Sequence, residues 1–111
     1  MQLQVRETIL RDAGFQVSIA TSAESALAVL RTAGRHFGVI VTDHVLPGAS
    51  GAEFVRQLRE LNPKVPVIVV SGMPDVDEEY AGSNAVIRHK PLPPPELIEL
   101  VRTALDGKHS Q

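Results

Sequence analysis

The sequence has 111 residues, of which 43% are hydrophobic and 22% charged, and its formal net charge at neutral pH is −2. These values are typical of one soluble globular domain that buries its own core. The weak negative charge offers no basic surface to a nucleic acid, and the absence of cysteine excludes disulfides and thiolate metal sites. No apolar run is long enough to span a membrane, so we expect a cytoplasmic protein without membrane or nucleic-acid partners.

The hydrophobic pattern predicts strands and helices that alternate along one α/β domain, residues 1–106, followed by a frayed tail, residues 107–111. Such alternation forms right-handed crossovers and a parallel sheet between two layers of helices. The expected elements are a helix over residues 2–13, an edge strand over 15–20, a helix over 21–34, a strand buried on both faces over 37–43, a helix over 50–62, a second buried strand over 66–71, a short helix over 75–81, a strand over 84–89 and a last helix from residue 96.

Local patterns predict how the helices begin and which faces they bury. Residues 21–24 and 50–53 each carry a hydroxyl followed three positions later by glutamate, a capping box that satisfies the first free amides of a helix. In the first helix, Val5, Ile9 and Ala13 recur at the spacing of one buried face.

Three expected strands end in a carboxylate, a hydroxyl and an ammonium group, namely Asp43, Ser71 and Lys90. The carboxyl ends of parallel strands share one edge of the sheet, where α/β folds place their ligand crevice. A carboxylate there can attack phosphorus, a lysine can neutralise the phosphoryl charge and a serine can donate to a phosphoryl oxygen. Taken singly, these residues are a turn former, a turn residue and a solvated lysine; their order at successive strand ends favours a joint function.

The segments Val-Thr-Asp43-His-Val-Leu-Pro-Gly-Ala-Ser-Gly51, Val-Ser71-Gly and His-Lys90-Pro91 resemble the receiver domain of two-component response regulators. The resemblance implies a flavodoxin-like, three-layer α/β/α sandwich with a parallel sheet. It makes Asp43 the phospho-acceptor, Ser71 the switch hydroxyl and Lys90 the phosphoryl contact. It also implies a Mg²⁺ ligand in the backbone carbonyl of Val45, and a cis Lys90-Pro91 bond.

By this resemblance the domain is a signalling phosphoprotein that takes a phosphoryl group from a histidine kinase or phosphotransfer protein. It is then no enzyme on external substrates, with at most weak autodephosphorylation, and is either free-standing or the last domain of a hybrid kinase. One alternative is a pseudo-receiver that binds proteins or dimerises without phosphorylation. A hydrolase of external phosphoesters is disfavoured, because such enzymes typically carry a second acid where this chain has Val45.

The resemblance is incomplete at the first residues, where family members have a central strand that ends in a pair of Mg²⁺-binding acids. This chain begins inside the following helix, so we expect it to lack the usual first strand and to bind Mg²⁺ weakly or not at all. Either the sheet closes up directly, a second copy fills the gap in a homodimer, or the natural protein is longer. The acidic residues Asp75, Asp77, Glu78 and Glu79 are candidates for a replacement metal ligand, against a solvated helix start.

A second departure lies three positions before the lysine, where the family usually has a switch tyrosine or phenylalanine and this chain has Ile87. Tyr80 is the only tyrosine, and we expect it to pack in the core and not to replace the switch residue. His44 follows the predicted acceptor and is a weaker candidate for tuning access to it.

Overall fold

The centre of the molecule is a three-stranded parallel sheet, seen in a computed structural model that describes residues 3–32 and 37–106. Its strands are β1 (Ile40–Asp43), β4 (Val67–Ser71) and β5 (Ala85–His89), in the order β1-β4-β5. Every residue of β4 is buried, because β4 pairs on both edges and is covered on both faces. The expected tail, residues 107–111, lies outside the described residues.

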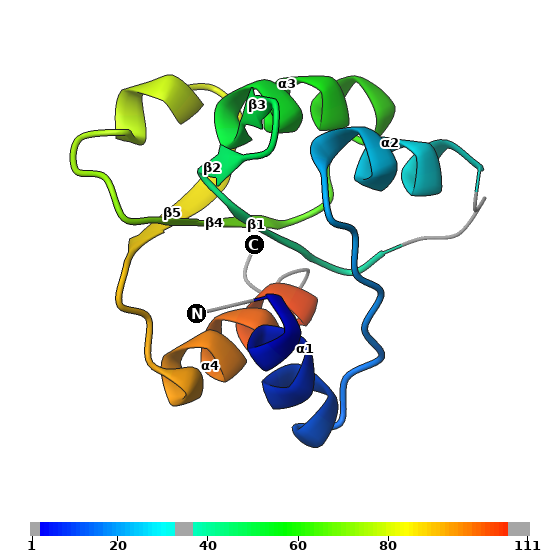
Figure 1. Cartoon of the computed structure of the whole chain (residues 1–111), viewed down its shortest axis with the longest axis vertical. Coiled ribbons are helices and arrows are strands. Elements are labelled where there is room, and N and C mark those ends of the chain that lie inside the picture. Colours follow the sequence, from blue (N-terminus) through cyan, green and yellow to red (C-terminus); the bar gives the residue numbers. More distant parts are fainter. Residues whose placement is uncertain (1–2, 33–36, 107–111) are drawn as a thin grey trace.

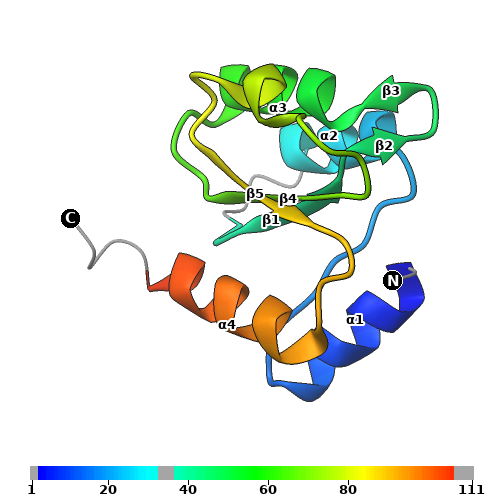
Figure 2. The ribbon, with the colours of Figure 1, turned by 90° about the vertical axis from the view of Figure 1, so that its left-hand side faces the viewer.

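Helices cover both faces of the sheet (Figures 1 and 2). On one face lie α2 (Ala23–Thr32), α3 (Gly51–Leu61) and the 3-10 helix η1 (Asp77–Tyr80); on the other lie α1 (Leu3–Asp12) and α4 (Pro94–Leu105). The apolar side chains correspondingly form two clusters, one on each face of β4. This arrangement confirms the expected three-layer α/β/α sandwich. Of the helices described, none is long and apolar enough to cross a membrane.

The register of the sheet brings the three predicted strand ends to one edge. Asp43 pairs with Val70 and Ser71 pairs with His89, so β4 and β5 end level with each other and β1 ends one residue before them. The amide of Lys90 donates to the carbonyl of Ser71 at 2.7 Å, which extends the β4–β5 pairing by one residue. The Lys90-Pro91 bond is cis, as expected.

A short antiparallel hairpin follows the Asp43 strand and was not predicted. It consists of β2 (Val45–Leu46) and β3 (Ala49–Ser50), joined by a turn in which Gly48 has a φ of +73°. The Ser50 hydroxyl accepts from the Glu53 amide at 3.1 Å, which confirms the predicted cap of α3. The cap of α2 is shifted by one residue: Ser22, and not Thr21, accepts from the Ser25 amide.

The expected strand over residues 15–20 does not form, and the sheet does not close up. These residues pair with no described strand, and within the described part of the chain β1 pairs with β4 alone. A cleft of about 740 Å³ lies between them and β1, walled by apolar side chains from both helical layers. For the same reason β1 is shorter than expected and only half-buried, whereas the sequence predicted burial on both faces.

The cleft stays open because the segment after α1 is anchored to the helices. Leu10 of α1 packs with Val101 of α4, and Phe15 and Val17 join the same cluster. The Arg102 guanidinium of α4 lies over the Phe15 ring, at 5.6 Å from its centroid. Closing the sheet would pull these side chains away from α4, so the apolar contacts of the helical layer prevail over strand pairing.

Gly51 allows α3 to begin directly against the end of β1. A methyl group at this position would lie 2.6 Å from the Asp43 carbonyl oxygen and 2.6 Å from the Tyr80 hydroxyl. Neither neighbour can yield easily, because one is backbone and the other is held in the core.

The substitution Gly51→Ala is therefore expected to destabilise the protein by about 1–3 kcal/mol through overpacking, although alanine is the better helix former. The matched control is Gly72→Ala, whose added methyl would meet only the Lys90 side chain at 3.8 Å and should cost little. Urea unfolding of both variants measures the difference, and a Gly51→Ala protein as stable as the parent would contradict this packing.

Candidate functional site

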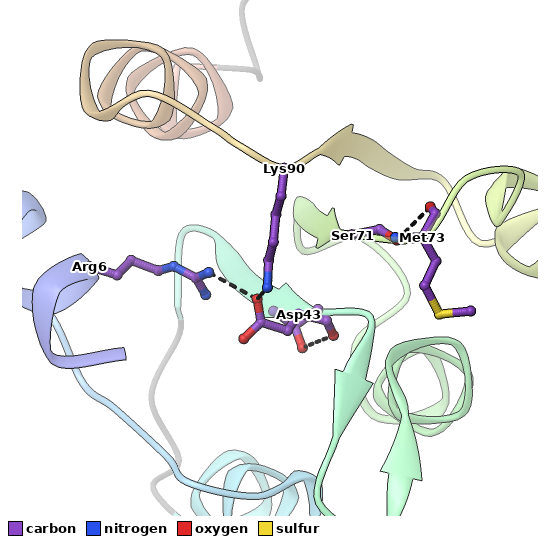
Figure 3. A network of polar contacts seen from close by, with 6 residues as sticks. Arg6, Asp43, Ser71, Met73 and Lys90 are labelled. Atoms are coloured by element: carbon purple, nitrogen blue, oxygen red, sulfur yellow. Dashed lines mark hydrogen bonds and ion pairs between the residues drawn. The ribbon is translucent and has the colours of Figure 1, made fainter. Parts of the chain in front are cut away.

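Asp43 lies at the carboxyl end of β1 between two cationic side chains (Figure 3). Its Oδ1 atom is 3.0 Å from Nη2 of Arg6 and 3.4 Å from Nζ of Lys90. The carboxylate is one-third exposed, so it remains open to a reagent from solvent. The structure thus brings together two of the three residues predicted for the site, and adds a third that was not predicted.

Arg6 reaches the site from α1 and is almost fully enclosed. Its side chain is 7% exposed, and its Nε atom is buried without a hydrogen-bond partner among the described residues. The sequence placed Val5 on the buried face of this helix, but Val5 is half exposed and the buried positions are Arg6 and Leu10. The i, i+4 spacing of Arg6 and Leu10 could have indicated that Arg6 lies on the buried face. A charged residue on that face needs a buried partner of opposite charge.

Ser71 is buried at the same edge, but its hydroxyl is engaged elsewhere. It donates to the Met73 carbonyl at 2.9 Å and accepts from the Met73 amide at 2.9 Å. Figure 3 shows this pair beside the cluster of Asp43 and Lys90. Ser71 therefore stabilises the turn after β4 in this state, and contact with a group on Asp43 requires that turn to rearrange.

The donor set at Asp43 does not fit Mg²⁺, the ion that the resemblance implies. Of the expected ligands, Asp43 Oδ1 already contacts two cations, and Val45 provides one backbone carbonyl. Within residues 3–32 and 37–106 no three acids or histidines are grouped to hold a metal, so the acidic residues 75–79 do not form a metal site with Asp43. Mg²⁺ requires several oxygen ligands in octahedral geometry.

Beneath the strand end, His44 and Tyr80 form a buried contact. His44 Nδ1 lies 2.7 Å from the Tyr80 hydroxyl, and the Glu79 carboxylate lies 3.8 Å from His44 Nε2. Burial and the nearby Glu79 charge raise the pKa of Tyr80 to about 12. The core position of Tyr80 confirms the expected packing role, while its bond to the residue after Asp43 was missed. Ile87 packs against the apolar cluster that contains Tyr80.

Tyr80 is expected to ionise only near pH 12 in the folded protein, against about 10 when unfolded. Because folding favours the neutral phenol, this contribution to stability is full below pH 10 and disappears as the pH rises through 12. The chain has one tyrosine and no tryptophan, so tyrosinate absorbance reports this residue alone. A native midpoint equal to that in urea would contradict the buried contact, and Tyr80→Phe is the control for stability.

Comparison with known proteins places this geometry in a family. The family described as response regulator receiver domain matches residues 1–102. The hydrogenase transcriptional regulatory protein HoxA of Cupriavidus necator is 35% identical over 104 residues, which are 90% of this chain and 21% of HoxA. The sensory transduction protein RegX3 of Mycobacterium tuberculosis is 32% identical over 100 residues, which are 87% of this chain and 43% of RegX3. The chain thus spans less than half of these relatives.

Solved structures agree. A CheY-like receiver domain protein from Methanospirillum hungatei superposes with a TM-score of 0.87 at 26% identity, over 97% of this chain and 87% of that one. The receiver domain of a Francisella response regulator gives a TM-score of 0.83 at 26% identity, over 95% and 88% of the two chains. With the family match over nearly the whole chain and the same overall fold in solved receiver domains, the chain belongs to the response regulator receiver domains.

Proposed function

We propose that this receiver domain accepts a phosphoryl group on Asp43 from a histidine kinase or a phosphotransfer protein. It acts as a signalling domain, and its own phosphorylation is the only reaction it takes part in. The observation that carries the proposal is the 3.4 Å contact between Lys90 Nζ and Asp43 Oδ1. Two residues far apart in the chain meet at the rim of the sheet, and one of them is a nucleophile.

The geometry supports the transfer in a simple way. An oxygen of the Asp43 carboxylate attacks phosphorus, the bond from phosphorus to the donor nitrogen breaks, and the donor imidazole keeps the electron pair. The Lys90 side chain is 39% exposed, so its ammonium group can move with the transferred phosphoryl group and neutralise the charge on the phosphoryl oxygens. The Ser71 hydroxyl would then exchange its bond to Met73 for a phosphoryl oxygen, which is how the arrival of the group would alter the turn after β4.

One observation favours a second function, that of a pseudo-receiver which binds proteins or dimerises without phosphorylation. The acceptor carboxylate is already held by the buried Arg6 guanidinium, and such an ion pair could be purely structural. The two functions differ in one measurable property, the formation of an acyl phosphate.

Incubation with acetyl phosphate and Mg²⁺ should add one phosphoryl group to the protein, detected by intact mass. The adduct should be absent in Asp43→Asn, present in the control Asp12→Asn, whose residue lies at the exposed end of α1, and removed by hydroxylamine. A protein that stays unmodified would contradict the receiver function and support the pseudo-receiver.

The variant Lys90→Gln should form the same adduct roughly a hundredfold more slowly, because the phosphoryl charge loses one of its cations. Arg88→Gln, two residues before Lys90 and paired with Glu96, is the matched control and should react at the parental rate. Equal rates for Lys90→Gln and the parent protein would rule out the role of Lys90.

A further inference from the structure

We propose that Arg6 occupies the place of a divalent cation in this site, so that Asp43 is phosphorylated without a metal ion. The inference rests on the proposed function and adds to it the identity of the cation. It starts from the disagreement between the donor set at Asp43, which does not fit Mg²⁺, and the two side-chain cations that contact its carboxylate.

The contacts leave the reacting oxygen free. Nη2 of Arg6 and Nζ of Lys90 both contact Oδ1, and among the described residues neither ion pair involves Oδ2. Because the two cations hold one oxygen from different sides, the carboxylate is fixed with its other oxygen available as the nucleophile (Figure 3).

Arg6 also has an unused donor. Its side chain is almost fully enclosed, and its Nε atom is buried with no hydrogen-bond partner in residues 3–32 and 37–106. A buried donor that stays unpaired is costly, so a ligand that accepts from it is favoured at this position. A phosphoryl group on Asp43 supplies up to three strong acceptor oxygens next to this guanidinium, and guanidinium groups bind phosphate through two parallel hydrogen bonds.

The charges agree with this assignment. Two positive groups surround one carboxylate in the resting site, and this positive excess repels an incoming divalent cation. After transfer, the carboxyl group is part of an acyl phosphate and no longer carries a charge, and the phosphoryl group carries close to two negative charges. Arg6 and Lys90 together then balance the phosphoryl group.

The step is balanced without a metal or a proton. With acetyl phosphate as donor, Oδ2 of Asp43 forms a bond to phosphorus, the bond between phosphorus and the bridging oxygen breaks, and acetate leaves with the electron pair. The guanidinium and ammonium groups stabilise the negative charge on the phosphoryl oxygens throughout.

The test compares phosphorylation of the full chain by acetyl phosphate in excess EDTA and in Mg²⁺, measured by intact mass. The parent protein should react at similar rates in both. Arg6→Gln should react at least about tenfold more slowly in EDTA. Arg11→Gln, an exposed arginine of the same helix that pairs with Glu7, should react like the parent.

A second measurement does not depend on reactivity. Calorimetric titration of the unmodified parent protein with Mg²⁺ should give no binding heat, and Mg²⁺ should leave its thermal unfolding midpoint unchanged. If Arg6→Gln does not fold, as judged by circular dichroism, Arg6→Lys replaces it: it keeps the charge but lacks the planar fork, and should react more slowly than the parent in EDTA.

The outcomes separate the two proposals. An adduct that forms only with Mg²⁺, binding of Mg²⁺ to the unmodified protein, or Arg6 variants that react as fast as the parent in EDTA would each overturn the role of Arg6 and leave the receiver function standing. No adduct under any condition would overturn the receiver function itself.

Discussion

The parallel pairing of β4 with β1 on one edge and β5 on the other is the constraint on which the rest of the molecule depends. It places Asp43, Ser71 and Lys90 at one rim, although they are separated by two crossovers along the chain. This pairing is hard to shift, because β4 is buried along its whole length and a slip would break its hydrogen bonds to β1 or β5 where no water can replace them. The distance between acid and amine is therefore a property of the sheet and not of flexible loops.

Helix α1, which lies with α4 on one face of the sheet, extends to this rim and contributes Arg6. A guanidinium that is enclosed on nearly all sides must be paired, and Asp43 is the partner that the fold offers. The position of α1 against α4 therefore depends in part on the charge of Asp43, which pairs with Arg6 of α1. The residue after Asp43 makes a second connection, since His44 ties the end of β1 to η1 through Tyr80. Asp43 and the residue after it thus contact elements on both faces of the sheet.

The sequence predicted what depends on local pattern and on periodicity. The buried strand β4, the Ser50 cap of α3 and the convergence of Asp43 with Lys90 follow from runs of apolar residues, capping chemistry and the geometry of parallel strands. The prediction of a strand over residues 15–20 was wrong. Alternation of apolar and polar residues indicates that a segment is half-buried, but it does not show that a neighbouring strand is there to pair with it. The Arg6 contact was missed because its partner is 37 residues away, and no local pattern names a partner at that separation.

One edge of β1 pairs with no strand among residues 3–32 and 37–106, and this exposes part of its backbone to the cleft. The amides of Ile40 and His44 donate to carbonyls on the β4 side, so those of Val41 and Asp43, which alternate with them, face the cleft. Half of the backbone groups of β1 therefore have no partner strand among the described residues and are open to the cleft. Within four consecutive residues at the centre of the domain, protection from hydrogen exchange should alternate between slow and fast, a pattern otherwise seen at the outer edges of sheets.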